Sequence, residues 1–105
     1  MANYVLAFKG GMQPESAEEG AAVMNAWMVW FGSLGEAIAS PGNPFGASAA
    51  LASDGSVSDT APSGLTGYTV LAADNLSAAT EMAKSCPHLA SGGTIEVYET
   101  VEVTM

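Results

Sequence analysis

The chain has 105 residues, of which 49% are apolar and 12% are charged, and its formal net charge is −9 at pH 7. This length is near the usual size of one domain, so we expect a single domain over residues 1–105. Lys9 and Lys84 are the only strong bases. Their scarcity argues against nucleic-acid binding, because neutralising phosphates requires clustered Lys or Arg.

Cys86 is the only cysteine, so an internal disulfide and a thiolate metal cage are excluded, and a reducing compartment fits best. The first residues include no basic segment, and their apolar run is too short for a secretory signal. No stretch approaches the ~20 apolar residues of a membrane span. We therefore expect a cytoplasmic protein that does not enter a membrane.

The first predicted element is a strand over residues 4–8, which ends at Gly10 and Gly11. Its apolar side chains alternate toward both faces, a pattern that indicates a central strand. A helix should follow from Ser16, whose hydroxyl can cap the N–H of Glu19 while Glu19 reaches back to the N–H of Ser16.

This helix is predicted to run to about Ile38, because apolar residues recur at spacings of three and four. The stripe consists of Val23, Trp27, Trp30, Phe31, Leu34 and Ile38. Met24 and Met28 widen it beyond what one face of a small sheet needs, which suggests a further contact.

Residues 40–66 are rich in Gly, Pro, Ser and Ala, and the pair Asp54-Gly55 suits a type I′ turn, so a small β-hairpin is expected there. Residues 67–73 predict a strand. Asp74 should cap a second helix, which Pro87 prevents from continuing. The last strand is predicted over residues 94–103, with one apolar side and one polar side.

These elements predict an α+β fold with the ferredoxin-like order β-α-β-β-α-β, in which helices cover only one face of an antiparallel sheet. An apolar sheet face would then lack cover within one chain. A second copy packed face to face at about 10 Å would bury it, so we expect a homodimer.

Five segments, residues 4–8, 26–30, 34–37, 42–45 and 86–97, resemble the YCII-related family, and in particular its DGPF-type branch. The resemblance covers nearly the whole chain. It implies membership of the dimeric α/β-barrel superfamily, in which two chains close their sheets into a shared barrel.

The chain departs from this family at two points. Residues 59–62 read Asp-Thr-Ala-Pro where the branch has Asp-Gly-Pro-Phe, so Asp59 is kept and the proline, Pro62, is displaced. Family members also show a histidine near the start of the first helix, thought to partner an aspartate, and this chain has no histidine there.

The weak catalytic candidates are Asp59, His88 and Tyr98, and none is assigned a catalytic role. His88 is the only histidine and could act as an acid or base near neutrality, although a lone histidine beside Pro87 is more often a turn residue. Tyr98 shares a predicted strand face with Glu96 and Glu102, where paired carboxylates could share a proton, hold a cation or simply meet solvent.

The candidate ligand-binding residues are Trp30, Asn43, Phe45, Asp59 and His88. A tryptophan stripe at helical spacing is nevertheless typical of core packing. Cys86 is interpreted as a buried, inert thiol at the C-terminal end of the second helix. No His and Cys metal-ligand set, Gly-x-Ser-x-Gly elbow, P-loop or Rossmann fingerprint is present, so we expect no metal and no cofactor.

Three functions remain open from the sequence. The first is a dimeric YCII-related protein that binds a small organic molecule between sheet and helices. The second is a cofactor-independent enzyme, a monooxygenase, isomerase or lyase acting on an aromatic or polyketide-like substrate. The third is a noncatalytic regulatory or partner module. A closed apolar pocket with a convergent Asp or His favours the enzyme, and a filled pocket favours the module.

Overall fold

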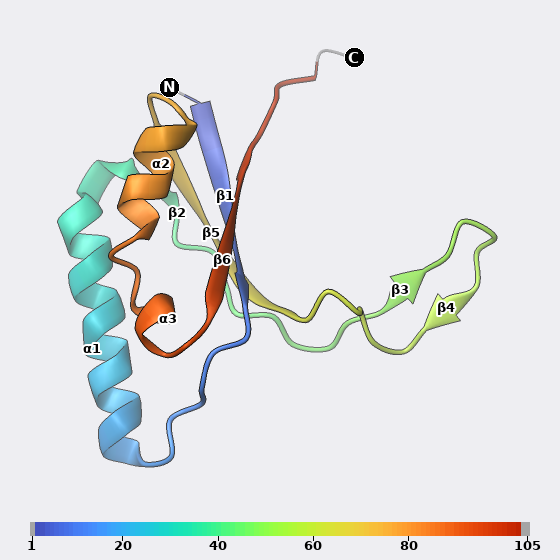
Figure 1. Ribbon diagram of the computed structural model, residues 1–105, viewed down its shortest axis with the longest axis horizontal. Helices are drawn as coiled ribbons and strands as arrows, with labels where there is room; N and C mark the ends of the chain where they lie inside the picture. Colours follow the sequence, from blue (N-terminus) through green and yellow to red (C-terminus); the bar gives the residue numbers. More distant parts are fainter. Residues whose placement is uncertain (1, 104–105) are drawn as a thin grey trace.

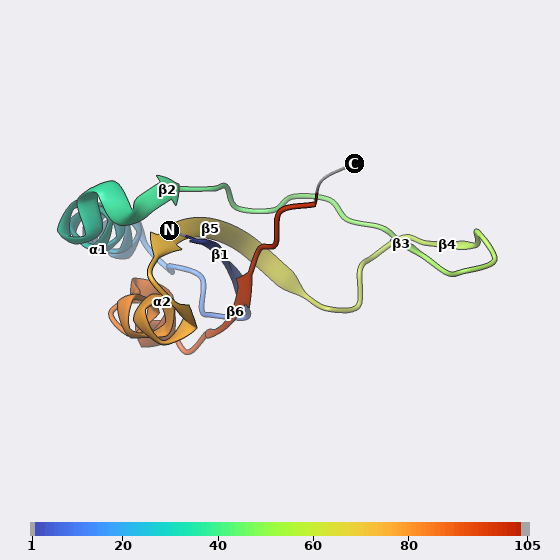
Figure 2. The same ribbon diagram turned by 90° about the horizontal axis from the view of Figure 1, so that it is seen from above.

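A computed structural model describes residues 2–103; Met1, Thr104 and Met105 of the expected domain lie outside the described residues. It is a small α+β protein whose helices lie together on one side of an antiparallel sheet (Figures 1 and 2). The elements are β1 (Ala2–Lys9), α1 (Ala17–Leu34), the 3-10 turn η1 (Gly35–Ala37), β2 (Ile38–Ser40), β3 (Ala50–Leu51), β4 (Val57–Ser58), β5 (Leu65–Ala73), α2 (Leu76–Ala83), α3 (Pro87–Ala90) and β6 (Thr94–Glu99).

The main sheet has four strands in the order β2-β5-β1-β6, so the prediction of a central first strand is confirmed. β1 pairs with β5 from Ala2 opposite Ala73 to Lys9 opposite Leu65, and it pairs with β6 along its other edge. The alternate residues Tyr4, Leu6 and Leu71 are at most 1% exposed and form the core.

α1 begins and ends differently from the prediction. The Ser16 hydroxyl accepts the Glu19 N–H at 3.1 Å, as expected, but the Glu19 carboxylate accepts the N–H of Glu15 rather than that of Ser16. The helix ends at Leu34 rather than near Ile38, because Gly35 adopts a φ of +54° that helical backbone cannot continue. Ile38 instead begins β2.

The predicted hairpin exists as β3 and β4, but its turn is not type I′. A type I′ turn needs a positive φ at both central residues, and Gly55 alone has one here, with φ +89°. The N–H of Gly55 donates to the Ala52 carbonyl and the N–H of Ala52 donates to the Ser56 carbonyl. The loop therefore has three residues and ends on a glycine.

Three further boundaries of the second half differ from the prediction. Asn75, not Asp74, caps α2, since its side-chain oxygen accepts the Ala78 N–H at 2.8 Å. Pro87 does prevent α2 from continuing, and it also opens α3 at the first helical position, where the missing N–H costs nothing. β6 ends at Glu99 rather than at residue 103.

Two segments lie away from the helices. The hairpin of β3 and β4 extends outward on the far side of the sheet (Figures 1 and 2). Val101 and Val103 follow β6 without joining a strand and are 76% and 75% exposed, so the predicted apolar alternation does not bury them. None of the helices within residues 2–103 has the length and hydropathy to cross a bilayer.

The segment after β2 contacts β5 so closely that only glycine fits at position 42. Gly42 has a φ of +71°, and a Cβ there would overlap the Tyr68 carbonyl oxygen. Beside it, the Tyr68 N–H donates to the Asn43 carbonyl at 3.2 Å and the Thr69 hydroxyl donates to the Pro41 carbonyl at 2.9 Å. These bonds extend the edge of the sheet beyond β2.

Gly42→Ala should lower the free energy of unfolding by about 2 kcal/mol or more, because it adds a strained φ to a backbone overlap. Urea unfolding would measure the loss. Gly46→Ala is the matched control, since a Cβ at Gly46 meets nothing within 4 Å and its φ is not positive. The control should stay within about 0.5 kcal/mol of the parent, and equal losses in both variants would contradict the packing described.

Candidate functional site

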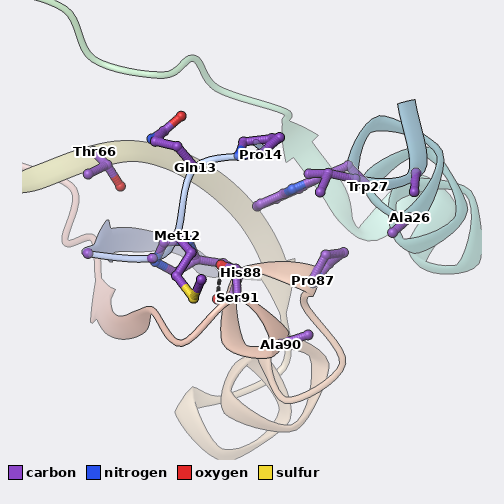
Figure 3. A pocket seen from close by; sticks show the side chains of 14 residues that line it. Met12, Gln13, Pro14, Ala26, Trp27, Thr66, Pro87, His88, Ala90 and Ser91 are labelled. Atoms are coloured by element: carbon purple, nitrogen blue, oxygen red, sulfur yellow. Dashed lines mark hydrogen bonds between the residues drawn. The ribbon is translucent and has the colours of Figure 1, made fainter. Parts of the chain in front are cut away.

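An open groove of about 520 Å³ separates α1 from β5 and the segment that follows β2. It adjoins a second hollow of about 470 Å³, and both are lined by Gln13, Val23, Trp27, Thr66 and His88. Figure 3 shows this second part, bounded by residues 12–14, by α1 and by α3. The groove thus joins segments that are far apart in the sequence.

The walls of the groove are mainly apolar. Trp27 packs edge-on against Phe8 with ring centroids 5.4 Å apart, and Phe31 lies 5.7 Å from Trp27. Met24 and Met28 continue the same side of α1 and are 66% and 69% exposed. Two flexible thioether side chains at the mouth suit an apolar ligand, since methionine adapts to irregular shapes.

His88 is buried at the junction of the two parts, in α3. Its Nε2 lies 2.9 Å from the Lys9 carbonyl oxygen, and its ring centroid lies 5.2 Å from that of Phe8. A carbonyl oxygen can only accept a hydrogen bond, so Nε2 carries the proton and Nδ1 of the neutral ring is an acceptor. His88 therefore ties α3 to the end of β1.

Two glycines make room for this imidazole. A Cβ on Gly93 would overlap the His88 ring, and a Cβ on Gly11 would lie 3.0 Å from its Cε1 atom. From the sequence, Gly10 and Gly11 predict only the end of the first strand. The additional role of Gly11 and Gly93 here is to admit an aromatic side chain close to the backbone.

Apart from His88, the polar side chains of the groove are uncharged. The hydroxyls of Thr66 and Thr69 donate to the backbone carbonyls of Phe8 and Pro41. Gln13 and Asn43 also line it. Among the described residues that line either part, none is Asp, Glu, Lys or Arg, so the groove offers hydrogen bonds without a fixed charge.

The structure brings two of the five predicted ligand-binding residues, Asn43 and His88, to the groove. Phe45 lies beside it and stacks on Tyr68, a groove residue, with centroids 5.7 Å apart. Trp30 lies in the core at 3% exposure, where its indole N–H donates to the Met82 carbonyl and the Ser85 hydroxyl.

Asp59 and Tyr98, the other catalytic candidates, lie away from His88. Asp59 is exposed and follows β4 in the hairpin. Tyr98 is 54% exposed on the sheet face opposite the core, and its hydroxyl donates to Glu96 at 2.7 Å. That bond is the main reason its pKa is raised. Glu102 lies beyond the end of β6, so the predicted three-residue face is reduced to this pair.

Cys86 is a buried free thiol, 3% exposed, and burial raises its pKa to about 11. The predicted inert thiol is therefore supported, but the predicted position is wrong. Cys86 precedes α3 at the N-cap position instead of ending α2. Desolvation rather than a helix C-terminus accounts for the direction of its pKa.

Several residues of the groove were not predicted from sequence. Gln13, Thr66 and Tyr68 carry no local pattern that marks them, because they come from the loop after β1 and from β5, which only the folded chain brings together. Met24 and Met28, by contrast, are marked by a sequence pattern, since they widen the apolar stripe of α1 beyond what the core covers. Their exposure explains that surplus.

The described residues contain no cluster of three or more His, Cys, Asp or Glu side chains arranged to hold a metal ion. The chain matches none of the protein-family models and none of the curated proteins with which it was compared. Its function must therefore be argued from the geometry of the groove.

The buried thiol makes stability depend on alkaline pH. The pKa of Cys86 rises from 9.0 to about 11 on folding, so the folded state holds this proton more tightly. The resulting stabilisation is complete below pH 9 and is lost as the pH rises toward 11. The free energy of unfolding should fall more steeply over this interval in the parent protein than in Cys86→Ala. Parallel slopes in urea titrations would show that the thiol is not buried as described.

The bond to the Lys9 carbonyl fixes the tautomer of His88. Two-bond ¹H–¹⁵N correlation spectra, recorded where the ring is neutral, should show a protonated Nε2 and an unprotonated Nδ1. The isolated peptide of residues 84–92 is the reference, because it lacks this carbonyl partner. A protonated Nδ1 in the folded protein would contradict the hydrogen bond.

Proposed function

We propose that this protein binds a small, uncharged, largely apolar organic molecule in the groove between α1 and β5. The observation that carries the proposal is the groove itself, where Trp27 and Met28 form an apolar wall near the buried His88. Its volume of about 520 Å³ falls within the usual range of about 300–1,000 Å³ for small-molecule sites.

The chemistry of the lining supports an uncharged ligand. The groove contains no cationic side chain among its described residues, and the whole chain carries a net charge of −9. An anion would therefore meet an unfavourable field without a partner. Neutral donors and acceptors at Gln13, Asn43 and His88 can orient a molecule that has one or two polar groups.

We also propose membership of the YCII-related family and its ferredoxin-like fold. Two observations support this fold. The main-sheet elements follow the sequence β1-α1-β2-β5-α2-β6, and the small hairpin is an insertion between β2 and β5. The family assignment rests on the sequence resemblance. The proposed location in the cytoplasm rests on the single cysteine, which fits a reducing compartment.

A homodimer formed through the open sheet face is part of the same proposal. The half-buried Val5, Val70 and Ala72 lie on the face opposite the core, where the helices give no cover (Figure 2). Face-to-face packing of two such sheets would remove this apolar surface from water at about 25 cal/mol per Å². Two chains would then close a barrel.

A second function, a cofactor-independent enzyme, is favoured by one observation. His88 lines the groove and has an acceptor nitrogen suited to taking a proton from a substrate. Its partner is a backbone carbonyl rather than a carboxylate, and Asp59 does not converge on it. Binding is therefore the better supported function, and the regulatory module, which would be expected to have a filled cavity, is supported least.

The binding function can be tested with N-phenyl-1-naphthylamine, a neutral aromatic probe whose fluorescence rises in apolar sites. The parent protein should bind it, and Met28→Glu should weaken binding at least tenfold, because a carboxylate at the mouth must be desolvated on contact with the probe. Fluorescence titration measures both constants.

Val29→Glu is the matched control for this experiment. Val29 is the next residue of α1 and is 64% exposed, close to the 69% of Met28, but it does not line the groove. The control should bind the probe like the parent. Equal weakening in both variants would locate binding elsewhere on α1, and no binding by the parent would refute the apolar site. Native mass spectrometry of protein from its own host would identify a bound molecule.

A further inference from the structure

The hairpin of β3 and β4 extends from the body on the side of the sheet that the helices leave open (Figures 1 and 2). Its hydrogen bonds are local: besides the turn, the Ala61 N–H donates to the Ser48 hydroxyl at 2.9 Å. We name residues 46–64 the arm. A two-stranded hairpin alone is at best marginally stable in water, so the arm is the kind of segment that gains order from a partner.

The arm carries an exposed apolar pair. Leu51 and Val57 are directly opposite each other across β3 and β4, so their side chains lie on the same face of the hairpin. They are 73% and 64% exposed. The other pair of this ladder, Ala50 and Ser58, belongs to the opposite face. One face of the arm thus carries two large aliphatic side chains, and the other carries only small ones.

The charges of the arm lie outside its apolar pair. Within residues 46–64 only Asp54 and Asp59 are charged, although the chain contains eleven acidic residues. The Leu51–Val57 pair itself is uncharged and exposed, as is typical of residues that become the buried centre of a protein interface.

The length of the arm decides which surface it can contact. The eight residues from Gly46 to Ser53 can extend roughly 26 Å at about 3.3 Å per residue. A four-stranded sheet is only about 14 Å wide at about 4.8 Å between strands. A copy seated on the open face of the sheet therefore lies within reach of the arm.

We infer that, in a two-fold dimer formed through the open sheet faces, each arm crosses onto the partner subunit and packs its Leu51–Val57 pair against it. This inference rests on the proposed dimer and adds a second contact to it. Because a two-fold interface is isologous, the two arms make the same contact twice. The surface that the apolar pair of the arm contacts thus belongs to a second copy of this chain.

The inference can be tested by placing two carboxylates on the arm. Leu51→Glu/Val57→Glu should raise the dimer dissociation constant on the order of tenfold or more, since both apolar contacts are lost in each subunit. Sedimentation equilibrium measures the constant. Ser53→Glu/Ser58→Glu is the matched control, because it adds the same charge at exposed arm positions without removing apolar surface. The control should change the constant less than threefold.

The outcomes separate the arm from the dimer. A parent protein that remains monomeric at all concentrations overturns both the dimer and the arm contact. A dimeric parent whose two double variants dissociate equally overturns the arm contact alone and leaves the open-face dimer intact. Circular dichroism of all three proteins confirms that the main sheet is folded.

A photo-cross-linking residue, p-benzoyl-phenylalanine, at position 51 gives a direct readout. Irradiation of the dimeric protein should yield covalent dimers, whereas the same residue at position 58, on the opposite face of the hairpin, should yield at least fivefold fewer. Equal yields at both positions would contradict a directed contact through the Leu51–Val57 face.

Discussion

The pairing of β1 with β5 on one edge and β6 on the other is the constraint on which the rest of the molecule depends. It places the alternate side chains of β1 on the two faces of the sheet, and the helices cover one of these faces. The covered face holds the core around Leu6 and Leu71. The other face remains open, and the end of β1 supplies the carbonyl of Lys9 that positions His88 at the groove.

Local sequence patterns were sufficient for the long elements and insufficient for the short ones. The apolar runs that became β1 and β5, and the helical spacing in α1 and α2, are decided by periodicity over many residues. β2 has three residues, too few for any period, and it owes its strand geometry to β5. The end of α1 depends on one glycine conformation, and β6 ends at Glu99, opposite Tyr4, although β1 continues to Ala2.

The candidate site was predictable only in part, for a related reason. His88 is a candidate because it is the only histidine in the sequence. The additional methionines of α1 indicated a further contact surface on this helix. The groove itself is formed by residues that are distant in sequence, such as Phe8, Trp27 and Tyr68, which long-range strand pairing brings together. Trp30 and Trp27 share one stripe, yet packing against α2 buries the first and leaves the second to line the groove.

The two edges of the sheet carry a further consequence. β2 is only three residues long and is followed by Pro41 and Pro44, while β6 carries Glu96 and Glu99. Short strands, prolines and like charges all hinder the addition of a further strand from another molecule. Lateral strand addition is thereby disfavoured at both edges, which leaves the open face of the sheet as the surface through which copies could associate without extending it.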